Sequence, residues 1–173
     1  MFDDRLRVLI AEDETIIRLD LRQLLEKAGM EVCGEARDGL EAVELARTTK
    51  PDVALFDMKM PNLDGVEAAR RVYAERPMPI VMLTAYSDPA LVVRAIGAGV
   101  FGYLTKPFEE RDVVPAIQAA VARHAELLAA RRDIGRSQAP VDVVVRSSSG
   151  QTYPLRLQRK PDGTLDVTLQ NVK

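Results

Sequence analysis

The feature that most constrains this chain is a regular alternation of short apolar runs with longer amphipathic runs, which extends through residues 1–134. The apolar runs are uninterrupted, as is typical of strands buried on both faces. The amphipathic runs carry apolar residues at helical spacing. Strict alternation of strands and helices requires crossover connections, and therefore predicts a parallel sheet covered by helices. We expect strands at Leu6–Ala11, Glu31–Glu35, Val53–Phe56, Ile80–Leu83 and Val100–Leu104.

Capping and helix-stopping residues indicate where the intervening helices begin and end. Asp38 and Glu41 have the spacing of a capping box at the start of the second helical run. Gly29 follows the first run as a stop signal, and Asp88-Pro89 provides a cap and a first-turn proline for the fourth. The fifth helix is expected from about Glu110 to about Arg132.

Five strand–helix units predict a doubly wound α/β fold whose ligands bind at the carboxyl ends of the strands. In a five-stranded parallel sheet of order 2-1-3-4-5, the first and third strands are neighbours. Glu12 and Asp13 follow the first strand and Asp57 follows the third, so three carboxylates are expected at one edge of the sheet. Thr84 lies at the end of the fourth strand, and Lys106 lies beyond the fifth.

Three neighbouring carboxylates repel one another, and each is costly to keep ionised without a compensating positive charge. Mg²⁺ prefers oxygen ligands and retains water and phosphate oxygens, so it fits this set of side chains. Lys106 could bring a second positive charge. Such a site suits phosphoryl transfer to a carboxylate, in which Asp57 attacks while the cation and the lysine neutralise the transferred group. The hydroxyl group of Thr84 could then donate a hydrogen bond to a phosphoryl oxygen.

Four segments of the chain stand out together: AEDE at 11–14, LFDMKMPNLDG at 55–65, LTAY at 83–86 and YLTKPF at 103–108. They resemble the receiver domain of two-component response regulators, which has the CheY-like fold, and occur in the family's order and spacing within roughly residues 5–130. With IIRLDL, GEARDG and DMKMP, the receiver is most similar to those of regulators that carry an ANTAR RNA-binding domain. The C-terminal residues lack the helical ANTAR pattern and a helix-turn-helix.

The resemblance implies an acceptor and a metal site. Asp57 is similar in its position to the family's phosphoacceptor aspartate. This residue takes a phosphoryl group from a sensor histidine kinase in the presence of Mg²⁺ or Mn²⁺. Asp13 and Asp57 would ligate the metal directly, Glu12 would assist through water, and the backbone carbonyl of Lys59 would be a further ligand. Glu12 is longer than the aspartate that many receivers carry at this position.

The resemblance also implies a conformational switch. Thr84 and Tyr103 would form the switch pair, with Thr84 drawn toward the phosphoryl group and Tyr103 changing rotamer. Lys106 would pair with the phosphoryl group, and the Lys106-Pro107 peptide bond would be cis. A receiver is a phosphoacceptor signalling protein and not an enzyme, because it catalyses only its own phosphoryl transfer and autodephosphorylation.

Residues 141–173 follow a different pattern, in which apolar and polar residues alternate with period two. We expect a three-stranded antiparallel meander at Val141–Arg146, Gln151–Arg159 and Thr164–Gln170, with turn-forming residues between the strands. Residues 135–140 would link it to a receiver domain at 1–134. A sheet of this size is marginal by itself. Whether this β appendage is an added segment or a divergent output module stays open.

Three classes of output are compatible with these features. A regulator could act on a downstream protein or on its own tail. A transcription or antitermination regulator could bind nucleic acid through the C-terminal region, which carries a net charge of +3, whereas residues 1–134 carry −5 and are unsuited to nucleic acid. A flavodoxin-like or nucleotide-binding enzyme shares the fold but needs a glycine-rich first turn, and Ala11–Glu14 is acidic and lacks glycine. We favour the first class.

The fifth helical run continues beyond the length that a receiver requires. Ile117, Val121, His124 and Leu128 have the spacing of a coiled-coil seam, which predicts a homodimer through the extended helix as one hypothesis. The alternative is that these residues pack on the sheet of their own chain. His124 is expected to be a surface or interface residue.

The remaining sequence features concern the compartment. Cys33 is the only cysteine, so no disulfide can form within the chain, which fits a reducing environment. No apolar run approaches the ~18 residues of a membrane helix, and the MFDDRLR start lacks the features of a secretory signal. We therefore expect a cytoplasmic protein without membrane contact.

Overall fold

The computed structural model describes residues 5–85, 98–136, 141–146, 152–159 and 165–169. The chain forms two compact units, Met1–Ala125 and Glu126–Lys173. The expected fourth helix at Asp88-Pro89 lies outside the described residues. Among the described helices, none combines the length and the apolar character needed to cross a bilayer.

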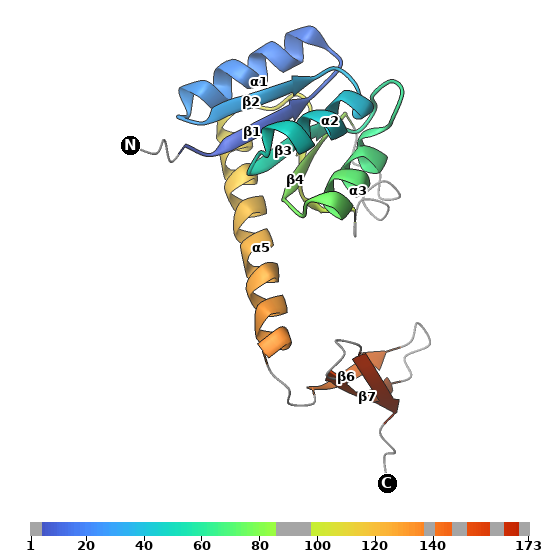
Figure 1. Cartoon of the computed structure of the whole chain (residues 1–173). Coiled ribbons are helices and arrows are strands. Elements are labelled where there is room, and N and C mark those ends of the chain that lie inside the picture. Colours follow the sequence, from blue (N-terminus) through green and yellow to red (C-terminus); the bar gives the residue numbers. More distant parts are fainter. Residues whose placement is uncertain (1–4, 86–97, 137–140, 147–151, 160–164, 170–173) are drawn as a thin grey trace. The chain divides into compact units, whose positions relative to one another are not determined.

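The first unit contains a five-stranded parallel sheet in the order β2-β1-β3-β4-β5 (Figure 1). This order confirms the predicted doubly wound α/β fold. β1 pairs with both β2 and β3, so the chain reverses its direction of winding beside β1. The strands are β1 (Arg7–Ala11), β2 (Glu31–Ala36), β3 (Val53–Asp57), β4 (Ile80–Thr84) and β5 (Val100–Thr105).

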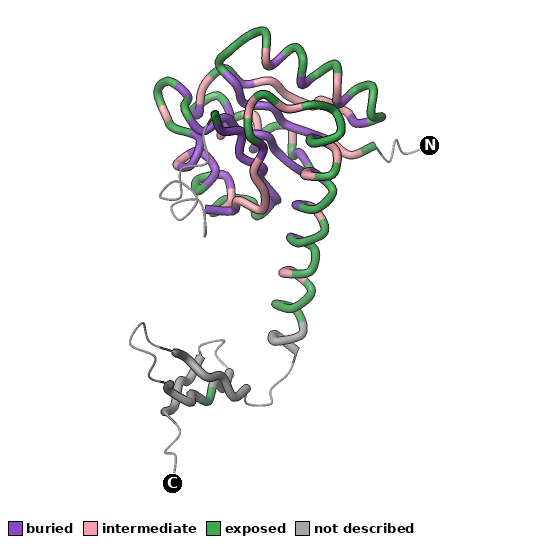
Figure 2. Tube along the Cα trace, turned by 180° about the vertical axis from the view of Figure 1, so that it is seen from behind, coloured by how far each residue is buried: buried purple, intermediate pink, exposed green. Residues whose placement is uncertain are grey.

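Helices cover both faces of this sheet. α1 (Thr15–Lys27) and α5 (Glu110–Arg136) pack on one face, where Leu21 and Ile117 join a core built on β1, β3 and β4. α2 (Gly39–Thr49) and α3 (Gly65–Glu75) pack on the other face. Because successive strand residues point to opposite faces, each central strand contributes to both cores. Buried residues are accordingly concentrated along the central strands (Figure 2).

The helix boundaries follow local capping chemistry. The side chain of Asp38 accepts a hydrogen bond from the backbone N–H of Glu41 at 2.8 Å, so the predicted cap of α2 is confirmed. This bond lowers the pKa of Asp38. Asp64 caps α3 in the same way by accepting from the N–H of Glu67 at 2.9 Å. Gly29 follows α1 with φ of +82°, a conformation that L side chains rarely adopt.

Helix α5 differs from its prediction in two respects. It extends to Arg136, four residues beyond the expected end, so the first two residues of the predicted 135–140 linker are helical. His124 was expected to be a surface or interface residue and is instead buried within its own chain. Its ring lies 5.1 Å from that of Phe101 and 6.1 Å from that of Tyr73, with edge-to-face geometry toward both. Aromatic partners from β5 and α3 therefore account for the burial.

The C-terminal unit contains the predicted antiparallel meander. Its strands are β6 (Val141–Arg146), β7 (Thr152–Arg159) and β8 (Leu165–Leu169), in the order β6-β7-β8. β7 pairs with both neighbours in antiparallel register. The expected turn segments between these strands lie outside the described residues.

Gly65 permits α3 to begin directly against the end of β3. A Cβ atom at Gly65 would lie 2.0 Å from the carbonyl oxygen of Asp57, a main-chain atom that cannot rotate away. We therefore expect Gly65→Ala to lower the free energy of unfolding by about 1–3 kcal/mol, as overpacking does. Urea denaturation measures this loss. Gly102→Ala is the control, because its Cβ would approach no atom closer than 3.6 Å; equal losses in the two variants would contradict the steric explanation.

Candidate functional site

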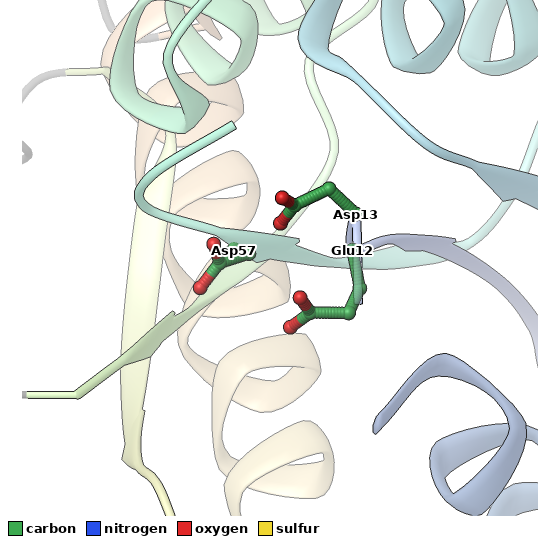
Figure 3. A group of neighbouring side chains, drawn as sticks. All are labelled: Glu12, Asp13 and Asp57. Carbon is green, nitrogen blue, oxygen red and sulfur yellow. The ribbon is translucent and has the colours of Figure 1, made fainter. Parts of the chain in front are cut away.

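Three carboxylates from two neighbouring strand ends meet at one edge of the sheet (Figure 3). Glu12 and Asp13 directly follow β1, and Asp57 is the last residue of β3, the strand beside it. One oxygen from each side chain lies within 4.8 Å of the other two. Glu12 and Asp57 are buried and Asp13 is exposed, so the cluster extends from the interior to the surface. The structure thus brings together the three acids that the sequence placed at this edge.

Lys106 lies between the two buried carboxylates. Its Nζ is 2.6 Å from Glu12 Oε2 and 2.9 Å from Asp57 Oδ1. The backbone N–H of Lys106 donates to the carbonyl oxygen of Thr84 at 2.8 Å, which ties the residue to the end of β4. The Lys106-Pro107 peptide bond is cis.

The pKa values in this cluster reflect burial and mutual interaction. Burial is the main cause of the raised pKa of Glu12; the Asp57 carboxylate reinforces it, and the hydrogen bond with Lys106 opposes it. Burial also disfavours the Lys106 ammonium group, but its bonds to Glu12 and Asp57 outweigh this effect and raise its pKa. Lys106 therefore remains charged and offsets part of the negative charge of the acids.

The residues of the cluster fit a hard divalent cation. The Lys106 ammonium group pairs with two of the three carboxylates, which leaves negative charge in the cluster. The available ligand atoms are carboxylate oxygens, which suit Mg²⁺ or Mn²⁺. The backbone N–H of Lys59 donates to Asp57 Oδ2 at 3.2 Å, so the main chain of residue 59 runs beside the Asp57 carboxylate. The role of the Lys59 carbonyl as a ligand stays a prediction.

A hydrogen-bonded main chain supports the site. The N–H of Glu12 donates to the carbonyl of Ala36 at 3.1 Å, and the N–H of Glu14 donates to Glu12 Oε1 at 3.1 Å. On the β3 side, Met58 N–H bonds to the carbonyl of Leu83, and its own carbonyl accepts from Gly65, both at 3.0 Å. Hydrogen bonds to neighbouring strands therefore hold the turns that carry the acids.

A register shift positions the predicted switch pair. Between Ile80 and Val81 the β4–β5 register slips by one residue, so that Val81 pairs with Gly102 and Met82 pairs with Tyr103. Tyr103 therefore lies on the same face of the sheet as Thr84, two residues along the ladder. Thr84 is buried, and partial burial raises the pKa of Tyr103. Their roles in switching stay a prediction.

The family of response regulator receiver domains matches residues 8–118, well over half of the chain. The chain belongs to this family. Among curated relatives, the transcriptional regulatory protein PdtaR of Mycobacterium tuberculosis is 51% identical over 128 residues, which cover 74% of this chain and 62% of PdtaR. The chemotaxis protein CheY of Thermotoga maritima is 38% identical over 112 residues, which cover 64% of this chain and 93% of CheY. The receiver thus spans nearly all of CheY but less than two thirds of PdtaR.

Solved receiver structures share the fold. The signal receiver domain of a modulated diguanylate cyclase from Desulfovibrio desulfuricans G20 is 36% identical, with a TM-score of 0.67, and the match covers 72% of this chain and 99% of that one. The chemotaxis protein CheY4 of Vibrio cholerae is 31% identical, with a TM-score of 0.64, and covers 67% of this chain and 98% of CheY4. The family predicted from the sequence motifs is confirmed.

The sequence alone did not single out two features of this receiver site. Arg18 is buried in α1 beside Leu21 and Leu25, and its guanidinium group contacts the acidic turn. A charged residue at core-facing helical spacing was the available signal. Asn62 donates to the capping residue Asp38 at 2.8 Å and so links the loop after Asp57 to α2; no pattern in the sequence indicated this pair.

The raised pKa of Glu12 predicts that metal binding by this receiver is sensitive to acid. A carboxylate with a raised pKa takes up a proton at a higher pH than an ordinary glutamate, and that proton competes with a cation. We expect the dissociation constant for Mg²⁺, measured by titration calorimetry, to rise as the pH falls from about 8 to about 5. Glu12→Gln should weaken this dependence. An equal dependence in the variant would exclude Glu12 as its source.

Proposed function

We propose that Asp57 accepts a phosphoryl group from the phosphohistidine of a sensor histidine kinase. The observation that carries the proposal is the position of the Lys106 ammonium group, which lies 2.6 Å from Glu12 and 2.9 Å from Asp57, two of the three clustered acids. Asp57 lies at the carboxyl end of a parallel strand, beside the lysine ammonium group and the other acids that could hold a metal. A carboxylate in such surroundings is suited to attack a phosphoryl group.

In the proposed transfer, an oxygen of Asp57 attacks phosphorus. The new O–P bond forms as the N–P bond to the donor imidazole breaks, and the electron pair of that bond stays on the imidazole nitrogen. Lys106 neutralises charge on the phosphoryl oxygens, and Glu12 keeps the ammonium group in place through the 2.6 Å ion pair. Asp13, Asp57 and the Lys59 carbonyl would hold Mg²⁺, with Glu12 assisting through water. When bound, Mg²⁺ would supply further positive charge to the transferred group.

The proposed output step is a population shift between two conformations of the receiver. A phosphoryl group on Asp57 adds negative charge and hydrogen-bond acceptors next to Thr84, whose hydroxyl group would move toward them. Tyr103 shares that face of the sheet, and its rotamer would change with Thr84. The surface around β5 would then favour a different partner.

We propose that the receiver comprises residues 1–134 and that the β appendage at 141–173 contributes to the output. A protein partner, or the appendage itself, would recognise the phosphorylated state in the cytoplasm. The second candidate is a regulator that binds nucleic acid through its C-terminal region. The observation in its favour is the similarity to PdtaR, a transcriptional regulatory protein, although the match covers only 62% of PdtaR.

Intact-protein mass spectrometry tests the acceptor directly. After incubation with acetyl phosphate and Mg²⁺, we expect the wild-type chain to gain the mass of one phosphoryl group and Asp57→Asn to gain none. Asp20→Asn is the matched control, because Asp20 is an exposed aspartate of α1. A phosphoryl group retained by Asp57→Asn would show that another residue is the acceptor.

Sedimentation velocity tests the proposed homodimer through α5. Ile117 and His124 are buried within their own chain, so the available part of the predicted seam begins near Leu128, which is half-buried. We expect acetyl phosphate to shift the wild-type chain toward a dimer, and Leu128→Glu to remain monomeric because it places charge in the seam. Ala122→Glu, on the exposed side of α5, should behave like the wild type. If the wild-type chain stays monomeric at high concentration both with and without acetyl phosphate, the dimer is ruled out.

A further inference from the structure

Arg18 is a charged residue in a core position next to the acidic cluster. Its side chain is only 9% exposed, and the other buried residues of α1 are Leu21 and Leu25. Helical side chains lean toward the N-terminus of their helix, so an arginine in the first turn of α1 extends back over the turn that joins β1 to α1. A buried guanidinium group is costly unless it is paired, so its partners indicate what it does.

Two of the partners of Arg18 are main-chain carbonyl groups of that turn. Nη1 donates to the carbonyl oxygen of Glu12 at 2.7 Å and lies 3.5 Å from that of Asp13. Nη2 lies 3.4 Å from Thr15 Oγ1. The ion pair with Glu35 is longer, at 3.7 Å, and the other oxygen of Glu35 bonds to Arg22 at 2.7 Å. The shortest bond of the buried guanidinium group is therefore to the main chain of a proposed metal-site residue.

This bond completes the immobilisation of Glu12. Its backbone N–H is bonded to Ala36, its Oε1 accepts from the N–H of Glu14, and its Oε2 pairs with Lys106. Arg18 holds the one remaining polar group, the carbonyl. That carbonyl belongs to the peptide unit joining Glu12 to Asp13, so its orientation sets the direction in which both acidic side chains leave the turn.

We propose that Arg18 is a positioning residue for the divalent cation: through the Glu12 carbonyl it holds the acidic turn in the orientation that binds the metal. The inference rests on the proposed function of the site. It differs from a role in stability alone, because the guanidinium group acts on the peptide that carries two of the three acids. Partners outside the ligand shell of a metal that orient its ligands typically contribute about 10- to 100-fold to metal affinity.

The test compares Arg18→Met with Arg22→Met in the full chain. Arg22 is the matched control because it lies on the same helix and shares Glu35, yet it is exposed and bonds to Glu26 and Glu35. Titration calorimetry with Mg²⁺ alone, with folding verified by circular dichroism, should give a dissociation constant about tenfold higher for Arg18→Met. Arg22→Met should match the wild type. Equal dissociation constants for the wild type and a folded Arg18→Met would overturn the inference.

Rescue by the metal separates positioning from a general loss of structure. At saturating Mg²⁺, we expect the rate at which acetyl phosphate labels Asp57 to return to the wild-type value in Arg18→Met. A rate that stays low in the folded variant would overturn the positioning role. If Arg18→Met does not fold, Arg18→Lys replaces it. A lysine keeps the charge but lacks the planar guanidinium group with its several donors. The dissociation constant of Arg18→Lys should therefore exceed that of the wild type, and a wild-type value would overturn the inference.

The wild-type chain and Asp57→Asn are measured in parallel so that the two claims fail separately. A wild-type chain that binds no Mg²⁺ would refute the metal site and this inference with it. An Asp57→Asn chain that still takes the phosphoryl group would refute only the proposed acceptor. Wild-type binding and labelling, combined with an unaltered Arg18→Met, would refute only the role of Arg18.

Discussion

The contact of the Lys106 ammonium group with two buried carboxylates is the interaction on which the rest of this receiver depends. Two acids in the interior of a protein are tolerated only with a compensating positive charge. Lys106 supplies one such charge at 2.6 Å from Glu12 and 2.9 Å from Asp57, but Asp13 adds a third carboxylate at the rim. The remaining negative charge suits the site to a divalent cation and, in the proposed function, to a phosphoryl group bound together with that cation.

The strand order of the fold, and not proximity in sequence, brings the acids and the lysine together. β1 and β3 are neighbours although α1, β2 and α2 separate them along the chain, so the acids of their two ends meet. The Lys106 N–H bonds to the end of β4, which brings the lysine to the same edge. Glu12, Asp57 and Lys106 thus each lie where a strand meets the turn that follows it.

Periodicity and strand-end chemistry are local patterns, and they predicted the strands and the acids that follow them. The order 2-1-3-4-5, taken from the doubly wound fold class, then placed Glu12, Asp13 and Asp57 together. Features set by distant partners were harder to predict. His124 was expected to be a surface or interface residue; its burial depends on its aromatic partners, Phe101 and Tyr73, which lie on other elements. The β4–β5 register shift that turns Tyr103 toward the face of Thr84 had one sequence signal, a glycine inside a strand at position 102.

The end of helix α5 was also not predicted correctly from the sequence. Its continuation through Gly135 to Arg136 was missed because glycine is a poor helix former and was taken to begin a linker. The burial of Arg18 was also overlooked, although its spacing from Leu21 and Leu25 places this charged residue at a core-facing position of α1. The buried guanidinium group bonds to the main-chain carbonyl of Glu12. A sequence does not show which main-chain acceptors a side chain can reach.

The central claim, that the acids form a metal site compensated by Lys106, is tested most directly by a crystal structure of the chain grown with Mn²⁺ and measured at a wavelength where manganese scatters anomalously. The account predicts one anomalous peak between Asp13 and Asp57, with Glu12 close by and the Lys106 ammonium group still beside Glu12 and Asp57. An anomalous map without a peak among these carboxylates, from crystals in which the site faces solvent, would contradict it.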